Sequence, residues 1–282
     1  MAGIALTEQE ADEIGVEAHT DLYPLIQMDA TRRQFVRFVV CATVLSVLAT
    51  ASNAQQSKAE WSYTGEDSPA KWGKLDAAYA TCSVGTRQSP VNIAKPKTAD
   101  LPVLQFHYSA VPLNIIDNGH TIQVNYPAGS TLQVGDKTYT LKQFHFHHPS
   151  EEQINGKGYD MVAHLVHADD DGHLAVVAVL LKSGASNSFL ASIWKNFPAE
   201  KEKSIENASV SVNAADLLPS DHAYYTFLGS LTTPPCSEGV TWYVLKTPVQ
   251  LSSEQVAAFA EVYPMNARPV QPLNGRELLS SK

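Results

Sequence analysis

The sequence predicts a mainly β protein with a few short helices. Apolar and polar residues alternate over Thr121–Tyr126 and Thr131–Val134, which is the two-residue period of a strand with one buried face. The unbroken apolar run Leu174–Leu181 is typical of a strand buried on both faces. A helical pattern is confined to residues 187–196 and 253–262. The 282 residues, 44% of them hydrophobic, can bury one large core, so we expect a single folded domain.

Three histidines have the spacing of a metal site. His145 and His147 alternate with Phe144 and Phe146, so a strand here presents both imidazoles on one face and both phenyl rings on the other. A glycine-rich stretch of 16 residues leads to His164, which is long enough for a loop and a returning antiparallel strand. Three neutral imidazoles leave the fourth position of a tetrahedral zinc open to water. A lone His-x-His is usually structural, so the surrounding residues must decide between the two interpretations.

The first 54 residues differ in composition from the rest. Thr31–Arg37 contains the paired arginines of a twin-arginine export signal and precedes an apolar run over residues 38–49. We therefore expect residues 28–54 to be a signal peptide that is removed after Ala54, or alternatively after Ala51, leaving the rest of the chain in the periplasm. An uncleaved anchor is the alternative. Because the apolar run is short for a membrane span, we expect no stable membrane insertion of the mature domain.

The segment before the signal has an unusual charge. Residues 1–27 contain six acidic residues and no Lys or Arg, the opposite of the basic start of a signal peptide. Met28 is therefore a plausible true start, and residues 1–27 would be a non-native extension or a disordered acidic prefix. Without residues 1–54, 17 basic and 22 acidic residues remain, so the formal net charge changes from −9 to −5. No basic patch interleaved with aromatic residues occurs, so we expect no nucleic-acid partner.

Short motifs follow one another in a specific order between Trp61 and Arg276. They are Trp61-Ser62-Tyr63, Gln88–Ile93, Asn118-Gly119-His120, Gln143–His147, Ser150-Glu151, His164–His167, Gly229–Pro235, Val240–Trp242, Asn266–Pro269 and Asn274-Gly275-Arg276. Over about 215 residues the ordered set resembles the α-class carbonic anhydrases, in particular their exported bacterial members. The resemblance implies a single catalytic domain over residues 55–282, with a large, mostly antiparallel, twisted central sheet and short peripheral helices.

The resemblance also implies a reaction, the reversible hydration of carbon dioxide to bicarbonate and a proton by a carbonate dehydratase, which is a lyase. His145, His147 and His164 would hold Zn²⁺ as the cofactor. The metal would lower the pKa of its bound water to about 7, the value known for carbonic anhydrases themselves. Thr232 would accept a hydrogen bond from the resulting hydroxide and donate one to Glu151. These two hydrogen bonds would turn the nucleophile toward the substrate carbon.

Further residues match positions of this family. His120 matches a proton shuttle that acts through a water chain, a role suited to an ordinary imidazole pKa of about 6.5; the alternative is an ordinary turn histidine. The implied substrate wall is Val166, Val176, Leu231, Val240 and Trp242, with Thr233 lining the same pocket. The implied water network is Tyr63, Asn92 and Asn118, and the implied outer partners are Gln143 for His145 and the backbone carbonyl of Asn266 for His147.

Two departures from the family pattern concern the third histidine. The position two residues before His164 commonly carries a glutamate that pairs with this histidine, but here it is Val162. A water or another carboxylate would have to take its place, and losing such a partner typically costs about 10- to 100-fold in metal affinity or activity. Glu152 replaces a common family histidine, which puts the hydrogen bonding of its loop in doubt.

Only two cysteines remain once the signal is removed, Cys82 and Cys236. A disulfide is the default expectation for an exported protein, and two free buried thiols are the alternative. The resemblance implies a bridge between these two positions that holds the loop carrying Thr232.

The sequence also bears on two other function classes. A binding protein that kept the fold and lost catalysis would be expected to lack a zinc histidine, and none is lost. A zinc hydrolase of esters would use the same nucleophile, but no separate G-x-S-x-G motif is present. We therefore expect a small-molecule substrate, carbon dioxide or bicarbonate, bound by a monomer or homodimer.

Overall fold

The computed structural model describes residues 59–282. The expected signal peptide, its cleavage site and the acidic segment before it lie outside the described residues. The helices are α1 (Trp72–Leu75), α2 (Thr81–Val84), α3 (Ser188–Trp194) and α4 (Ser253–Val262), with 3-10 turns at Gly65–Asp67, Ala77–Tyr79 and Ala214–Leu217. The strands are β1 (Asn92–Ile93), β2 (Lys97–Thr98), β3 (Leu104–His107), β4 (Val111–Asp117), β5 (Ile122–Asn125), β6 (Thr131–Val134), β7 (Lys137–His147), β8 (Gln153–Ile154), β9 (Met161–Ala168), β10 (Leu174–Ser183), β11 (Ser204–Val212), β12 (Tyr224–Ser230), β13 (Glu238–Leu245), β14 (Val249–Leu251) and β15 (Leu279–Ser280).

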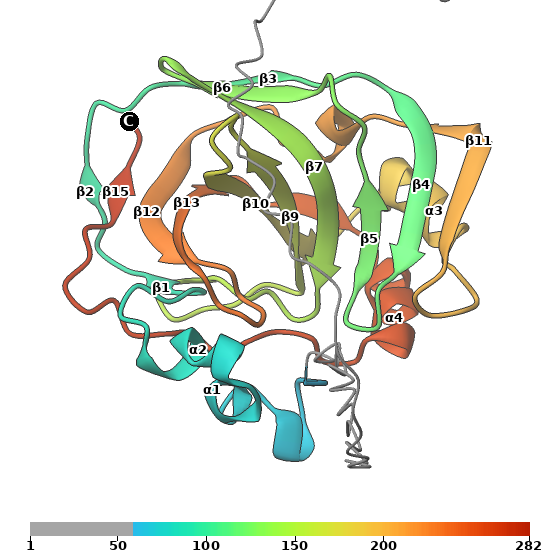
Figure 1. The fold of residues 1–282 in the computed structure, drawn as a ribbon. Coiled ribbons are helices and arrows are strands. Elements are labelled where there is room, and N and C mark those ends of the chain that lie inside the picture. The colour runs from blue at the N-terminus through green and yellow to red at the C-terminus, as the bar shows by residue number, and fades with distance from the viewer. Residues whose placement is uncertain (1–58) are drawn as a thin grey trace, which may run out of the picture. The chain divides into compact units, whose positions relative to one another are not determined.

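A strongly twisted sheet organises the described chain (Figure 1). Thirteen strands form it, in the order β11-β4-β5-β7-β9-β10-β13-β12-β15-β2, with β3, β6 and β14 joined at the sides. The path from β4 to β10 is antiparallel, whereas β10 pairs in parallel with β13 and β14. The predicted mainly β fold with short helices is confirmed, and the sheet is mixed rather than purely antiparallel.

The central strands separate two apolar clusters. Phe144 and Phe146 of β7 are fully buried in the larger cluster, where they pack with residues of α3 and α4. Burying a phenyl ring from water contributes about 1.5–3 kcal/mol each, which fixes which face of β7 looks inward. The same alternation places His145 and His147 on the opposite face. Strand β10 lies between β9 and β13 and is buried on both faces, as its unbroken apolar sequence predicts.

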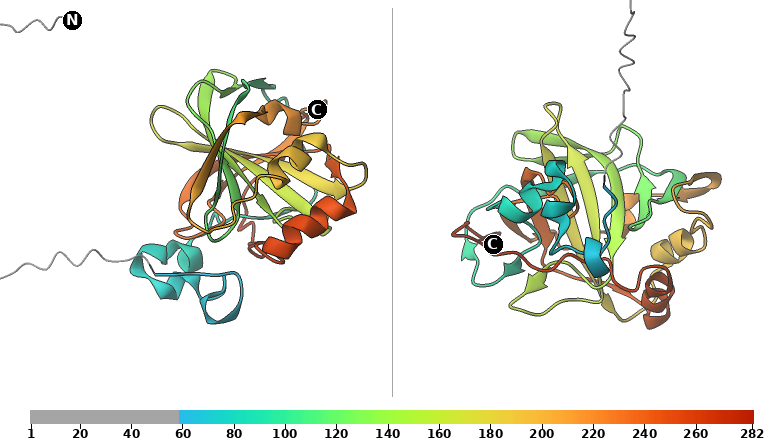
Figure 2. Two further views of the ribbon diagram at one scale, coloured as in Figure 1. Left: turned by 90° about the vertical axis from the view of Figure 1, so that its right-hand side faces the viewer. Right: turned by 60° about the horizontal axis from the view of Figure 1, so that its bottom comes forward.

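The two longer helices lie where the sequence predicts them. Helix α3 begins after Asn187, whose side chain accepts a hydrogen bond from the Leu190 amide, and α4 begins with a capping box of Ser252 and Gln255. Helices α1 and α2 have four residues each, too few to show a helical period in the sequence, and they lie together at one end of the sheet (Figure 2). Among residues 59–282, no helix is long and apolar enough to span a membrane.

A disulfide joins Cys82 of α2 to Cys236 in the segment after β12, across a sequence separation of 154 residues. The prediction of this bridge is therefore confirmed. The Arg268 guanidinium donates to the backbone carbonyl of Cys82, and the Gln88 side chain donates to that of Cys236. The covalent link and these hydrogen bonds hold the segment that carries Thr232 against the N-terminal part of the domain.

Candidate metal centre and active site

The register between β7 and β9 brings the three histidines together. His145 lies directly opposite His164, and His147 lies opposite Val162, on paired antiparallel strands. One ring nitrogen from each of the three histidines lies within 4.8 Å of the others, and all three rings are buried or nearly so. The returning antiparallel strand predicted from the sequence therefore delivers the third imidazole to the face that carries the first two.

Two of the histidines have their other ring nitrogen occupied by a hydrogen bond. Nδ1 of His145 donates to the side-chain oxygen of Gln143 at 2.8 Å. Nδ1 of His147 donates to the backbone carbonyl of Asn266 at 2.7 Å. These are the partners expected from the sequence. In each case the bond fixes the tautomer that leaves Nε2 without a proton and free to bind a metal.

The third histidine, His164, forms its hydrogen bond through Nε2 rather than through Nδ1. Its Nε2 lies 3.1 and 3.2 Å from the two carboxylate oxygens of Glu152, which leaves Nδ1 free. The sequence left open whether a water or another carboxylate replaces the glutamate missing at Val162. The carboxylate of Glu152, the second departure from the family pattern, occupies that place. In the loop that carries Glu152, this side chain therefore contacts His164 directly.

The residues fit a metal ion. Nε2 of His147 is buried and has no hydrogen-bond partner in the described chain, which is unfavourable for a polar atom unless a ligand occupies the space before it. Burial lowers the pKa of His145 to about 3 and that of His147 well below its ordinary value, so both are neutral donors near pH 7. Burial also lowers the pKa of His164, but the charges of Glu152 and Glu151 and the hydrogen bond with Glu152 together outweigh this effect and raise it overall.

Glu151 lies beside the free histidine nitrogens. Its Oε1 accepts a hydrogen bond from the Arg268 amide at 2.8 Å. Its Oε2 lies 3.7 Å from Nε2 of His147 and 3.8 Å from Nδ1 of His164. Burial raises the pKa of this carboxyl to about 7. Oε2 is buried and has no hydrogen-bond partner among the described residues, and the buried side chain of Thr232 lies close enough to lower the pKa of the carboxyl.

An apolar wall flanks the centre on one side. The five residues expected to form it belong to a single cluster with Val162: Val166, Val176, Leu231, Val240 and Trp242. Val176 pairs with Val166 of β9 on one side and with Trp242 of β13 on the other, which places the three side chains in one row. The indole of Trp242 meets the His164 ring edge to face at 4.9 Å. Thr233 comes two residues after Leu231 of the wall, and its backbone carbonyl accepts a hydrogen bond from the Cys236 amide at 2.8 Å.

The opposite side is polar. Oδ1 of Asn118 accepts from the amides of His120 and Thr121, and its Nδ2 donates to Gln123 at 3.3 Å. Gln123 pairs with His145 across β5 and β7, so it lies on the face of the three histidines. Sequence reasoning did not single out Gln123, because only the strand register shows which residue of β5 lies beside His145.

His120 stacks on an aromatic ring that the sequence did not assign to the site. The indole of Trp61 lies over its imidazole, with 3.6 Å between ring centroids and 10° between planes. Burial lowers the pKa of His120, and the positive charge of Lys201 lowers it further. The ring is therefore neutral near pH 7 and able to accept a proton.

Tyr63 and Asn92, two expected members of the water network, have different surroundings. Tyr63 meets Trp61, the ring that stacks on His120, edge to face at 5.4 Å. Burial, with the charge of Glu151, raises the pKa of its hydroxyl well above the ordinary value. Asn92 lies in β1, and its side-chain oxygen accepts from the Gly156 amide at 2.7 Å in the loop after β8. No contact of Asn92 with the other expected network residues is found in the described chain, so its side chain serves the turn instead.

Comparison with known proteins decides the family. A sequence profile of the eukaryotic-type carbonic anhydrases matches residues 67–282. The chain belongs to this family. The carbonic anhydrase of Neisseria gonorrhoeae is 46% identical over 238 residues, which cover 84% of this chain and 94% of the relative. The α-carbonic anhydrase of Photobacterium profundum is 47% identical with a TM-score of 0.74, and the α-carbonic anhydrase of Thermovibrio ammonificans, solved with the inhibitor sulfanilamide, is 41% identical with a TM-score of 0.76. Each match covers 78% of this chain and 99% or more of the solved structure.

Family membership makes this chain an enzyme, a carbonate dehydratase that interconverts carbon dioxide and bicarbonate. The three candidate metal ligands lie within the matched residues, as do Thr232 and Glu151.

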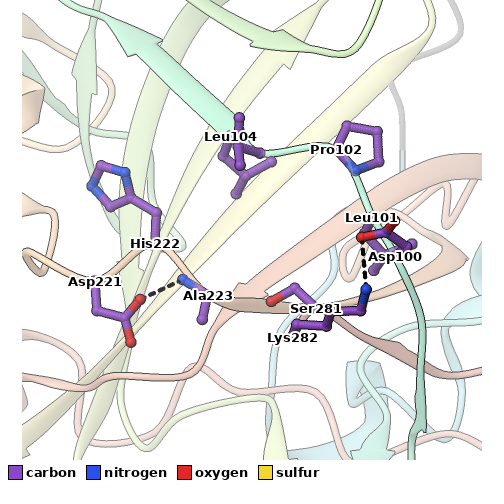
Figure 3. A pocket seen from close by; sticks show the side chains of 10 residues that line it. Asp100, Leu101, Pro102, Leu104, Asp221, His222, Ala223, Ser281 and Lys282 are labelled. Carbon is purple, nitrogen blue, oxygen red and sulfur yellow. Dashed lines mark hydrogen bonds and ion pairs between the residues drawn. The ribbon is translucent and has the colours of Figure 1, made fainter.

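This carbonic anhydrase also has a hollow away from the metal centre, between the segment before β3 and the C-terminus (Figure 3). Two of its acidic side chains have partners within it. Lys282 forms an ion pair with Asp100 at 3.2 Å, and Asp221 accepts from the Ala223 amide at 3.0 Å. None of the catalytic candidates lines it.

Proposed function

We propose that this carbonic anhydrase hydrates carbon dioxide at a zinc site formed by His145, His147 and His164. The observation that carries the proposal is the convergence of three ring nitrogens within 4.8 Å, each left free by a hydrogen bond to the other nitrogen of its ring. Three imidazole donors with an open fourth position are the usual donor set of a catalytic zinc. When bound there, zinc supplies Lewis acidity that brings the pKa of a coordinated water to about 7, as known for this family.

Thr232 and Glu151 orient the nucleophile. In this proposal the Thr232 hydroxyl donates a hydrogen bond to the Glu151 carboxylate, so the hydroxyl oxygen is available to the nucleophile only as an acceptor. Thr232 would then accept a hydrogen bond from the nucleophile and direct the nucleophile's lone pair toward the substrate carbon, which is a contribution of orientation. The Arg268 amide, 2.8 Å from Glu151, holds the carboxylate in place.

The apolar wall receives the substrate. Carbon dioxide carries no charge and donates no hydrogen bond, so a surface of Val166, Val176, Leu231, Val240 and Trp242 can accept it without leaving a polar group unsatisfied. Thr233 supplies a hydroxyl that can bind bicarbonate before it leaves. Bicarbonate gains little from the apolar residues, so its release is favoured.

His120 carries the proton away from the site. Its lowered pKa keeps the ring neutral and ready to accept, and its partly exposed position allows it to pass the proton to buffer. Asn118, Gln123 and Tyr63 lie on the polar side, where they order the water molecules between the metal centre and His120.

We place the mature enzyme in the periplasm. The disulfide between Cys82 and Cys236 supports an oxidising compartment, and the paired arginines before an apolar run support export. Mass spectrometry of protein purified from the periplasm would test both points. A mature N-terminus at Gln55 agrees with the proposal, and a chain that retains Met1 contradicts it.

Removal and restoration of the metal test the proposed site. The purified protein is dialysed against a chelator, and carbon dioxide hydration and zinc content are measured before and after zinc is added back. Activity that disappears with the metal and returns at one zinc per chain supports the proposal. Activity that persists without metal overturns it. A chain that takes up one zinc without hydrating carbon dioxide would be a binding protein with a carbonic anhydrase fold.

A further inference from the structure

Glu152 is buried and has one side-chain partner. The residue is fully excluded from solvent, and both carboxylate oxygens lie within 3.2 Å of Nε2 of His164. No other hydrogen bond to this carboxylate is found in the described chain. A buried carboxylate needs a strong partner to offset its lost hydration, so the pairing with His164 defines the position of Glu152.

The loop between β7 and β8 brings Glu152 to this position. The Ser150 hydroxyl donates to the backbone carbonyl of Glu152 at 2.9 Å and accepts from the Tyr159 amide at 2.8 Å. The following residue, Gln153, donates its amide to Val91 at the start of β8. The backbone on both sides of Glu152 is therefore held by hydrogen bonds, and the carboxylate does not have to be ordered by the metal.

Two consecutive glutamates lie on opposite sides of the His164 ring. Oε2 of Glu151 lies 3.8 Å from Nδ1, whereas Glu152 lies 3.1 Å from Nε2. Glu152 occupies Nε2 of this ring. The nitrogen left free is the one that faces Glu151, at the centre of the site.

Position 162 cannot supply the same contact in this chain. Val162 lies on the same face of β9 as His164, directly opposite His147 of β7 and Leu180 of β10. Its side chain is fully buried in the apolar wall. In this chain the carboxylate beside His164 therefore comes from the loop, and the strand position two residues before the histidine is part of the apolar surface.

We propose that Glu152 is the positioning residue of the third zinc ligand, and that the pair Val162 and Glu152 is a relocated form of one carboxylate–histidine contact. The proposal rests on the metal site of the proposed function. Glu152 accepts a hydrogen bond from Nε2–H of His164, which fixes the tautomer with Nδ1 free and fixes the plane of the ring. A carboxylate partner also makes His164 a stronger donor than His145 and His147, whose partners are a neutral amide and a backbone carbonyl.

Zinc affinity, measured by competition with a chromophoric chelator, tests this role without using activity. Glu152→Ala should weaken zinc binding about 10- to 100-fold. Glu152→Gln keeps the size and one acceptor oxygen, so its affinity should lie between those of the parent and Glu152→Ala. Glu206→Ala removes an exposed carboxylate of β11 and should leave the affinity unchanged. Circular dichroism and the unfolding midpoint of each metal-free variant establish that it is folded.

A rescue variant separates positioning from packing. Adding Val162→Glu to Glu152→Ala returns a carboxylate to the strand position, and we expect zinc affinity to recover at least tenfold over Glu152→Ala. A parent protein that binds no zinc would overturn the proposed function itself. A parent that binds zinc, with folded Glu152→Ala binding it equally tightly, would leave the function standing and overturn the role of Glu152.

Discussion

The indole of Trp61 lies flat against the imidazole of His120, with 3.6 Å between the ring centroids. Trp61 also meets Tyr63 and Trp72 edge to face, at 5.4 and 5.0 Å. The aromatic cluster that anchors the N-terminal part of the domain therefore covers one face of the proposed proton shuttle. This contact fixes the orientation of the ring and removes part of its surface from water.

Replacement of Trp61 by alanine should raise the pKa of His120. Two effects oppose one another. The variant loses a cation–π stabilisation of the imidazolium, about 0.5–1 kcal/mol at an exposed site, which lowers the pKa. It also exposes the ring, and burial is the largest cause of its lowered pKa, so the second effect should dominate. NMR titration of the imidazole measures the result, with Trp61→Phe as the control that keeps an aromatic face. A lower pKa in Trp61→Ala would show that the stack acts mainly through its charge interaction.

His120→Ala should slow turnover without weakening use of the substrate. Proton release follows hydration, so kcat in dilute buffer should fall on the order of 10²-fold while kcat/KM for carbon dioxide stays unchanged. Added imidazole should restore kcat, because it replaces the missing acceptor. The matched control is His148→Ala, whose ring is bonded to the Pro264 carbonyl, and it should retain the parent's kcat. Equal kcat in His120→Ala and the parent at low buffer would exclude His120 as the shuttle.

The sequence could predict the parts of this site that depend on local alternation. The pattern Phe144, His145, Phe146, His147 determines which side chains face the core, and β7 follows it. It could not predict partners set by long-range pairing or loop geometry. Glu152 reaches His164 across 12 residues of chain through a loop, and Trp61 reaches His120 across the domain. The parallel pairing of β10 with β13 is likewise absent from any local pattern.

Loss of the disulfide should lower stability. The bridge joins residues 154 positions apart in the sequence. Its removal increases the conformational entropy of the unfolded chain, which favours unfolding. We expect the double variant Cys82→Ser, Cys236→Ser to lose about 2–5 kcal/mol of unfolding free energy in urea titration. The parent protein treated with a reductant provides the comparison, and it should lose a similar amount. Equal stability with and without the bridge would mean that the hydrogen bonds of Arg268 and Gln88 hold this region alone.

His167 should make the protein sensitive to acid. The ring is fully buried, with Nε2 2.6 Å from the Tyr108 hydroxyl and Nδ1 bonded to the Ala175 carbonyl, and burial lowers its pKa to about 4. The His167 imidazole therefore becomes protonated below pH 6.5 in the unfolded chain, but only below about pH 4 in the folded protein. Stability due to this group is full above pH 6.5 and falls by up to about 1.4 kcal/mol per pH unit through this window.

Urea unfolding between pH 7 and pH 4.5 checks this expectation. His167→Gln, which does not titrate, should have a shallower loss of stability over that interval than the parent, even if it is less stable at pH 7. Parallel curves for the two proteins would assign the acid sensitivity to other groups.

Stopped-flow hydration of carbon dioxide tests the central claim most directly, with the zinc content of each sample determined in parallel. The account predicts fast, zinc-dependent hydration by the parent and its loss in His164→Ala, which removes one of the three imidazoles. A parent that carries one zinc per chain and does not accelerate hydration would contradict the catalytic role of the site and leave it as a metal-binding scaffold.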